Sequence, residues 1–207
     1  MIGEFARIEV LVFGRFSRWL AGIWLICFMG VAGAAPGGDF TLTRTDGSEF
    51  SLESVRGQVV VIAFGYTSCP DVCPTTLVTI SSLMKALGPR AQEVVPLFIS
   101  VDPHRDTAEK LRTYLDYFHP KIIGLSGKVE KLRQVVERYN TFFRYQGDTE
   151  SGSYVVDHSS GIYIVDRDGT LVRIVPYGMP TSQVVDSVRD VLGEPPAQPT
   201  ARGSAAD

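Results

Sequence analysis

The sequence predicts an α/β fold in which a mixed central sheet has helices on both faces and begins with a β-hairpin. Two unbroken apolar runs, Val59–Phe64 and Val94–Val101, are typical of strands that are buried on both faces. Between them, apolar residues recur at helical spacing over residues 77–87. A helix that joins two such strands makes them parallel. A strand pair near the C-terminus adds antiparallel pairing, so the sheet is mixed.

The first predicted element is the hairpin. Phe40–Leu42 and Glu49–Leu52 alternate apolar and polar residues around Asp46–Gly47, which is a turn signal. Pro36–Gly38 precedes it and is interpreted as a hinge that leads into the folded domain.

The helix between the two buried strands has clear limits. Pro74 suits its first turn, and Gly88–Pro89 suits its end. The next helix is expected to begin at Asp106, with Glu109 completing a capping box. The remaining elements come in order along the chain: a short strand at Ile122–Ile123, a helix over 129–139, an ambiguous stretch over 142–156, strands Ile162–Val165 and Leu171–Val175, and a helix over 184–192. This order is the thioredoxin-like layout, in which helices cover both faces of the sheet.

Segments of different composition flank this domain. Residues 19–35 carry no charge and come after Arg7, Arg15 and Arg18. Basic residues that flank a membrane segment favour the cytoplasmic side, so the chain after residue 35 is expected on the opposite side of the membrane. The run suits a membrane anchor or a cleaved signal peptide, and Ala32–Ala34 fits a cleavage site. We therefore expect an anchor or signal segment at 1–35, one domain at 36–192 and a disordered tail at 193–207.

Composition excludes some classes of function. The net charge of the 207 residues is −3 and no run of Lys or Arg occurs, so nucleic-acid binding has no electrostatic basis. Three cysteines are too few for a disulfide framework, so a close cysteine pair points to chemistry.

The pair is Cys69 and Cys73, on the loop before the central helix. Cys73 is expected to cap the helix that Pro74 opens, where the helix dipole would lower its pKa and favour a thiolate. A thiolate serves metal ligation and nucleophilic attack equally. Three intervening residues, where thiol oxidoreductases have two, let both sulfurs converge on one ion without forbidding a Cys69–Cys73 disulfide.

A third ligand is expected from His158, which precedes a strand. In a thioredoxin-like sheet that loop lies beside the cysteine loop, and two thiolates with an imidazole suit Cu(I). His104 and His119 are interpreted as ordinary surface residues. Asp157 either orients the imidazole or caps its loop, and Asp71 is a second candidate for a supporting carboxylate.

Three sequence blocks resemble the Sco/SenC family of copper-binding cytochrome c oxidase assembly proteins. The blocks are Thr67–Pro74, Ser100–Thr107, and Asp157–Ser159 with Tyr163–Asp166 and Gly169. The resemblance implies a thioredoxin-like fold and Cu(I) or Cu(II) held by Cys69, Cys73 and His158. It also implies a membrane-tethered domain on the periplasmic side that delivers copper to the CuA site of oxidase subunit II, served by a periplasmic copper donor or thiol reductant. Two alternatives stay open: a thiol–disulfide reductase that uses the same cysteines, and a redox or copper sensor.

Overall fold

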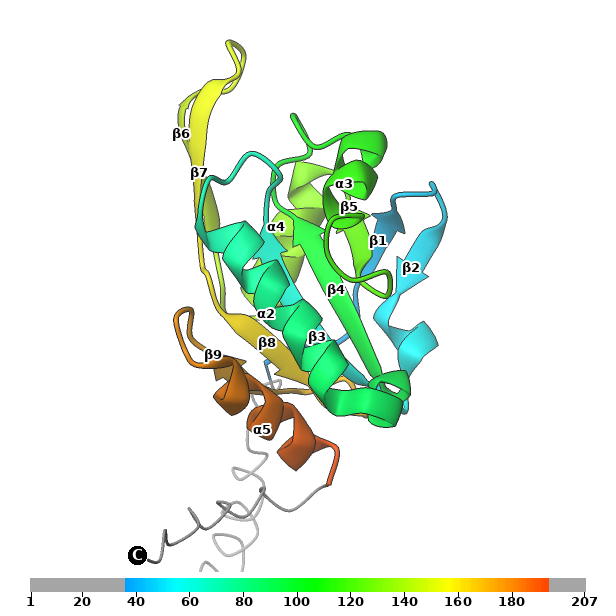
Figure 1. Ribbon diagram of the computed structural model, residues 1–207. Coiled ribbons are helices and arrows are strands. Elements are labelled where there is room, and N and C mark those ends of the chain that lie inside the picture. Colours follow the sequence, from blue (N-terminus) through cyan, green and yellow to red (C-terminus); the bar gives the residue numbers. More distant parts are fainter. Residues whose placement is uncertain (1–35, 194–207) are drawn as a thin grey trace, which may run out of the picture. The chain divides into compact units, whose positions relative to one another are not determined.

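The structure, a computed structural model, describes residues 36–193 (Figure 1). The predicted anchor or signal segment and nearly all of the predicted tail lie outside these residues. The elements are β1 Thr41–Arg44, β2 Glu49–Ser51, the 3₁₀ helix η1 Leu52–Val55, β3 Val59–Gly65, α2 Val72–Leu87, the 3₁₀ helix η2 Gly88–Glu93, β4 Val94–Ser100, α3 Ala108–Leu115, β5 Ile123–Ser126, α4 Val129–Arg138, β6 Phe143–Asp148, β7 Ser153–His158, β8 Ile162–Val165, β9 Leu171–Val175 and α5 Thr181–Val191. Within the described part of the chain, no helix combines the length and apolar character needed to span a membrane.

Seven strands form one mixed sheet in the order β2-β1-β5-β4-β3-β8-β9. The three central strands β3, β4 and β5 are parallel, whereas β1, β8 and β9 pair antiparallel to their neighbours. Every residue of β3 and β4 is buried, as the apolar runs predict. Helix α2 lies in front of the sheet in Figure 1 and α4 lies behind it. The thioredoxin-like fold class is therefore confirmed.

An aromatic cluster joins α4 to the sheet. Tyr139, at the C-terminal end of α4, is fully buried and lies edge-on to Phe40 with ring centroids 5.9 Å apart. Its ring also contacts Phe64 of β3 at 6.2 Å, and its hydroxyl donates to the Gly38 carbonyl at 3.2 Å. The residues just before β1 are thereby packed into the core.

The expected hinge at Pro36–Gly38 is wrong, because backbone hydrogen bonds fix this segment to the domain. Gly37 N–H donates to the Arg138 carbonyl at 2.7 Å, and Leu171 N–H donates to the Pro36 carbonyl at 3.1 Å. Gly37 has φ +98°, and a Cβ there would lie 2.7 Å from the Leu171 nitrogen. The glycine therefore permits a close backbone approach.

Two predicted helix starts are also wrong. Helix α2 begins at Val72 with Asp71 as its N-cap, so Cys73 lies in the first turn and is not the cap. Helix α3 is capped by Thr107, whose hydroxyl accepts from Lys110 N–H at 3.2 Å. The side chain of Asp106 turns into the protein, where buried donors replace the helix N–H groups that it was expected to cap.

The ambiguous stretch over 142–156 forms most of the hairpin β6–β7, drawn in yellow in Figure 1. Its two strands are hydrogen-bonded to each other, and in the described region neither pairs with the seven-stranded sheet. Burial alternates along β7, with Tyr154 and Val156 buried and Val155 exposed. Because β7 ends at His158, this hairpin determines where the predicted third ligand lies.

Candidate metal centre

Three predicted ligands meet at one point, although His158 is 85 residues beyond Cys73 in the sequence. The Sγ atoms of Cys69 and Cys73 and a ring nitrogen of His158 all lie within 4.8 Å of one another. Cys73 Sγ and His158 Nε2 are 3.5 Å apart. With bonds of about 2.3 Å to sulfur and about 2.0 Å to nitrogen, a trigonal ion separates such atoms by about 3.7 Å. The cluster is therefore close to the size that one ion requires.

The two cysteines differ in exposure. Cys69 lies in the loop between β3 and α2 and is half-buried, whereas Cys73, in the first turn of α2, is buried. Both are free thiols. The space behind Cys73 is closed by Gly65, the last residue of β3, where a Cβ would lie 2.7 Å from Cys73 Sγ. Cys73 is thus the fixed sulfur, and Cys69 is the one that a partner can reach.

The backbone fixes the tautomer of His158. Its Nδ1 lies 2.9 Å from the Ser159 carbonyl oxygen, which can only accept a hydrogen bond, so Nδ1 carries the proton of the neutral ring. Nε2 then has its lone pair directed towards Cys73. The ring also lies edge-on to Tyr66, with centroids 5.8 Å apart. The imidazole is therefore oriented for ligation before a metal arrives.

The expected lowering of the Cys73 pKa is wrong. Burial raises the pKa of the Cys73 thiol, and the neighbouring Cys69 raises it further. The residue lies inside the first turn, so the helix N-terminus does not offset the loss of water around the sulfur. In the metal-free protein Cys73 is therefore a neutral thiol that donates to His158 Nε2, and metal binding must release its proton.

Burial also acts on the histidine. It lowers the pKa of His158, while the Ser159 carbonyl and the charge of Asp157 oppose this effect. The neutral ring is the form that binds a metal, so the environment favours the competent state.

The two supporting carboxylates do not contact the ligands. Asp157 alternates with His158 along β7 and points to the other side, where it accepts from Gln146 Nε2 at 2.9 Å. The Ser159 carbonyl occupies the position at Nδ1 that Asp157 was expected to fill. Asp71 is exposed and caps α2 through its backbone, since its carbonyl accepts from Thr75.

The other histidines lie outside the cluster. His104 is exposed and packs edge-on against Tyr145, with centroids 5.6 Å apart. His119 Nδ1 accepts from Lys121 N–H at 3.2 Å. Over residues 36–193, no second group of three or more Cys, His, Asp or Glu residues has the geometry of a metal site.

A buried polar cluster beside the site was missed by sequence reasoning. Asp102 and Asp106 are 0% and 3% exposed, and they connect the cysteine loop to the β6–β7 hairpin. Both lie in the block Ser100–Thr107, in which charged residues suggest a solvated loop. Neither hydrophobic periodicity nor residue spacing indicates that these carboxylates turn inward.

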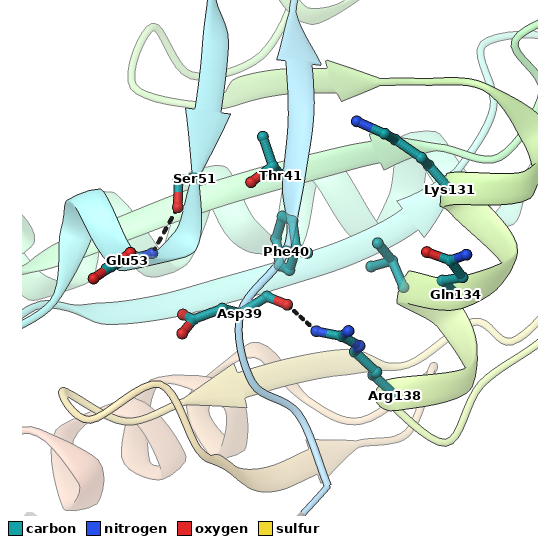
Figure 2. Close-up of a pocket in the computed structure, with 9 residues that line it drawn as sticks. Asp39, Phe40, Thr41, Ser51, Glu53, Lys131, Gln134 and Arg138 are labelled. Carbon is teal, nitrogen blue, oxygen red and sulfur yellow. Dashed lines mark hydrogen bonds between the residues drawn. The ribbon is translucent and has the colours of Figure 1, made fainter.

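A separate cavity of about 320 Å³ lies between the segment before β1 and α4 (Figure 2). In Figure 2 Lys131 and Gln134 extend from α4, and Arg138 donates to the carbonyl of Asp39. The Asp39 carboxylate is paired with Arg56 at 2.6 Å. No thiol or imidazole lines this cavity, so it is unrelated to the metal cluster.

The site makes the stability of the metal-free protein depend on pH. Because the folded state raises the Cys73 pKa, stability from this group is present below the unfolded pKa of about 8.5 and is lost as pH rises above it. The contribution of His158 to stability depends on pH in the opposite direction. Because its pKa is lowered in the folded state, its contribution is lost below about pH 6.5.

We expect Cys73→Ala to flatten the alkaline decline in the free energy of unfolding, by up to about 1.4 kcal/mol per pH unit. Urea unfolding of both proteins across this range measures it, and parallel profiles would contradict it.

Comparison with known proteins gives consistent matches. The SCO1/SenC family model matches residues 31–193. An SCO2-like protein of Rickettsia conorii is 38% identical over 138 residues, covering 66% of this chain and 67% of its own. The structure of Bradyrhizobium japonicum ScoI with copper bound is 38% identical, with a TM-score of 0.69 over 76% of this chain and 99% of that chain. The crystal structure of Arabidopsis thaliana ScoI with copper bound is 32% identical, with a TM-score of 0.70 over 77% and 99%.

Proposed function

This chain belongs to the SCO1/SenC family, and on that premise we propose that it binds copper through Cys69, Cys73 and His158 and delivers it to the CuA site of cytochrome c oxidase subunit II. The observation that carries the proposal is the convergence of two sulfurs and one imidazole nitrogen within 4.8 Å. Relatives of the same fold have been solved with copper bound.

The donor set suits copper as a cargo. Thiolates and imidazole are soft or borderline ligands that favour Cu(I), and the same set can hold Cu(II). Three donors leave a coordination position open, whereas a structural zinc site has four protein ligands. An open position allows a partner's ligand to join before one of this chain's ligands leaves.

Transfer begins at the exposed side of the site. Cys69 is half-exposed, so a thiolate of the recipient can approach the metal there and displace the Cys69 sulfur. Cys73 and His158 are then displaced in turn. The ligands exchange without a change in the oxidation state of either protein, so docking and access control the transfer.

The proposed location is the periplasmic face of the cytoplasmic membrane, with the domain held by residues 1–35 or released after cleavage. There the cysteines are exposed to oxidation, so an upstream thiol reductant must keep them reduced, and a periplasmic donor must supply copper.

A second function, thiol–disulfide reduction of the recipient's copper-ligand cysteines, is favoured by the unequal exposure of the pair. The Cys69 thiolate would attack the recipient's disulfide and form a mixed disulfide. The Cys73 thiolate would then displace the recipient's sulfur, which leaves a Cys69–Cys73 disulfide and two recipient thiols. This route does not use His158, so His158→Ala would retain reductase activity while losing copper.

The test is metal analysis of the reduced full-length protein and four variants. We expect about one copper per chain in the parent and in His104→Ala, and loss of stable copper in Cys69→Ser, Cys73→Ser and His158→Ala. In cells that lack the parent gene, only the copper-binding forms should restore the CuA absorbance of the oxidase. Unchanged copper affinity in His158→Ala would contradict the proposed ligand set.

A further inference from the structure

We infer that Asp106 and Asp102 are positioning residues that hold the two halves of the copper site in register. Asp106 fixes the loop that carries Cys69, and Asp102, together with Arg105, fixes the hairpin that carries the imidazole. The inference rests on the proposed function, because it assigns these roles relative to Cys69, Cys73 and His158.

The sulfur half is tied to Asp106. One carboxylate oxygen accepts from Thr67 N–H at 2.9 Å and from the Ser100 hydroxyl at 2.6 Å. The other accepts from the Thr67 hydroxyl at 2.6 Å. Lys110 lies 3.8 Å from the carboxylate and donates to the Ser68 hydroxyl at 3.1 Å. Of the two residues that precede Cys69, Thr67 is held by Asp106 directly, and Ser68 is held by Lys110, which is paired with Asp106.

The imidazole half is tied to Asp102. One carboxylate oxygen accepts from the Tyr154 hydroxyl at 2.5 Å, and the other accepts from Arg105 Nε at 2.6 Å. Arg105 Nη1 donates to the Tyr154 carbonyl at 2.8 Å, and the guanidinium carbon lies 3.7 Å from the centroid of the Tyr154 ring. Tyr145, on the partner strand β6, donates to the Val101 carbonyl at 2.9 Å. Both strands of the hairpin thus bind the same loop.

The two halves meet in a single turn of backbone. Asp106 N–H donates to the Asp102 carbonyl at 2.9 Å, and Arg105 N–H donates to it at 3.2 Å. These backbone hydrogen bonds place both carboxylates on one turn, from which each side chain reaches its own half of the site.

The hairpin depends on these contacts because its strands are not hydrogen-bonded to the main sheet in the described region. Side chains must then set the angle at which β7 delivers His158. Charge-assisted hydrogen bonds in a buried setting are strong and directional, which suits them to this role. Burial of two carboxylates is costly unless each is satisfied, and here both accept hydrogen bonds at both oxygens.

The two carboxylates predict separable defects. In Asp102→Asn an NH2 group replaces one carboxylate oxygen and cannot accept, so one of the hydrogen bonds from Arg105 and Tyr154 is lost and the hairpin loosens while the sulfurs stay in place. We expect the Cu(II)-loaded variant to keep its sulfur-to-copper charge-transfer absorption and to lose the imidazole nitrogen hyperfine signal in electron paramagnetic resonance. In Asp106→Asn we expect a change of about tenfold in the rate at which iodoacetamide alkylates Cys69 in the reduced, metal-free protein.

Milder variants keep the test valid if either substitution prevents folding. Tyr154→Phe removes only the hydroxyl that binds Asp102, and Thr67→Val removes only the hydroxyl that binds Asp106. Each should show the same defect as its partner carboxylate, at smaller size. Asp166→Asn is the matched control, since its carboxylate accepts backbone N–H groups at the distant β8–β9 turn.

The outcomes separate this inference from the proposed function. Parental nitrogen signals and parental Cys69 alkylation rates in all four variants would overturn the inference, as would equal defects in Asp166→Asn. If the parent lacks the nitrogen signal, or if His158→Ala retains it, the proposed ligand set fails instead. Both readouts report local geometry, so a general loss of stability does not reproduce them.

Discussion

Oxidation of Cys69 and Cys73 to a disulfide is expected to abolish copper binding, and reduction is expected to restore it. The two sulfurs already lie within 4.8 Å of each other, so bond formation requires a small movement. A disulfide supplies no thiolate, and the lone imidazole of His158 cannot retain the metal. Copper per chain should fall from about one to near zero, which is the largest effect that we predict.

The measurement is metal analysis after treatment with diamide, before and after a thiol reductant. Alkylation before oxidation should modify Cys69 first, because Cys73 is buried and its pKa is raised. The Cys73→Ala protein is the control for disulfide formation. It cannot form the Cys69–Cys73 disulfide, so diamide should leave the gel mobility of its monomer unchanged. Stoichiometric copper in the oxidised protein would mean that the ligands lie elsewhere.

Addition of one methyl group at Gly65 is expected to destabilise the protein and to weaken its copper site together. A Cβ at this position would lie 2.7 Å from Cys73 Sγ and 2.9 Å from two ring carbons of Phe98. Overpacking of this kind costs about 1–3 kcal/mol of stability. Because the sulfur must move, we also expect copper affinity to fall by about tenfold or more, equivalent to ~1.4 kcal/mol.

Gly124→Ala is the matched control for this change. Its Cβ would also be crowded, at 2.6 Å, but by the flexible tip of Leu115 and not by a ligand. Urea unfolding should show a loss of stability in both variants, whereas competition with a Cu(I) chelator should show weaker binding only in Gly65→Ala. Parental affinity in Gly65→Ala would show that the position of Cys73 is not constrained by β3.

The central architecture could be predicted from the sequence because burial leaves a periodic signal. The apolar runs of β3 and β4 and the helical spacing of α2 specify their positions directly. The cluster of Cys69, Cys73 and His158 could be predicted because few residue types bind soft metals and the chain contains few of them.

The errors arose where tertiary contacts override local signals. Asp106 has the sequence context of an N-cap, yet buried donors from Thr67 and Ser100 bind it instead. Cys73 lies near a helix N-terminus, yet burial dominates its pKa. The polar run between β6 and β7 hides a hairpin whose buried residues face a loop distant in sequence.

The attachment of Pro36–Gly38 fixes the point at which the polypeptide enters the domain. Pro36 and Gly38 bind the backbone around the β8–β9 turn, which lies near Val59 and Val60 at one end of β3. Gly65, at the other end of β3, abuts Cys73. The point where the chain enters the domain and the Cys73 sulfur thus lie at opposite ends of β3, a seven-residue strand about 20 Å long. A force applied through the chain before Pro36 would therefore act at the end of β3 that is remote from Cys73, and not directly on the sulfur.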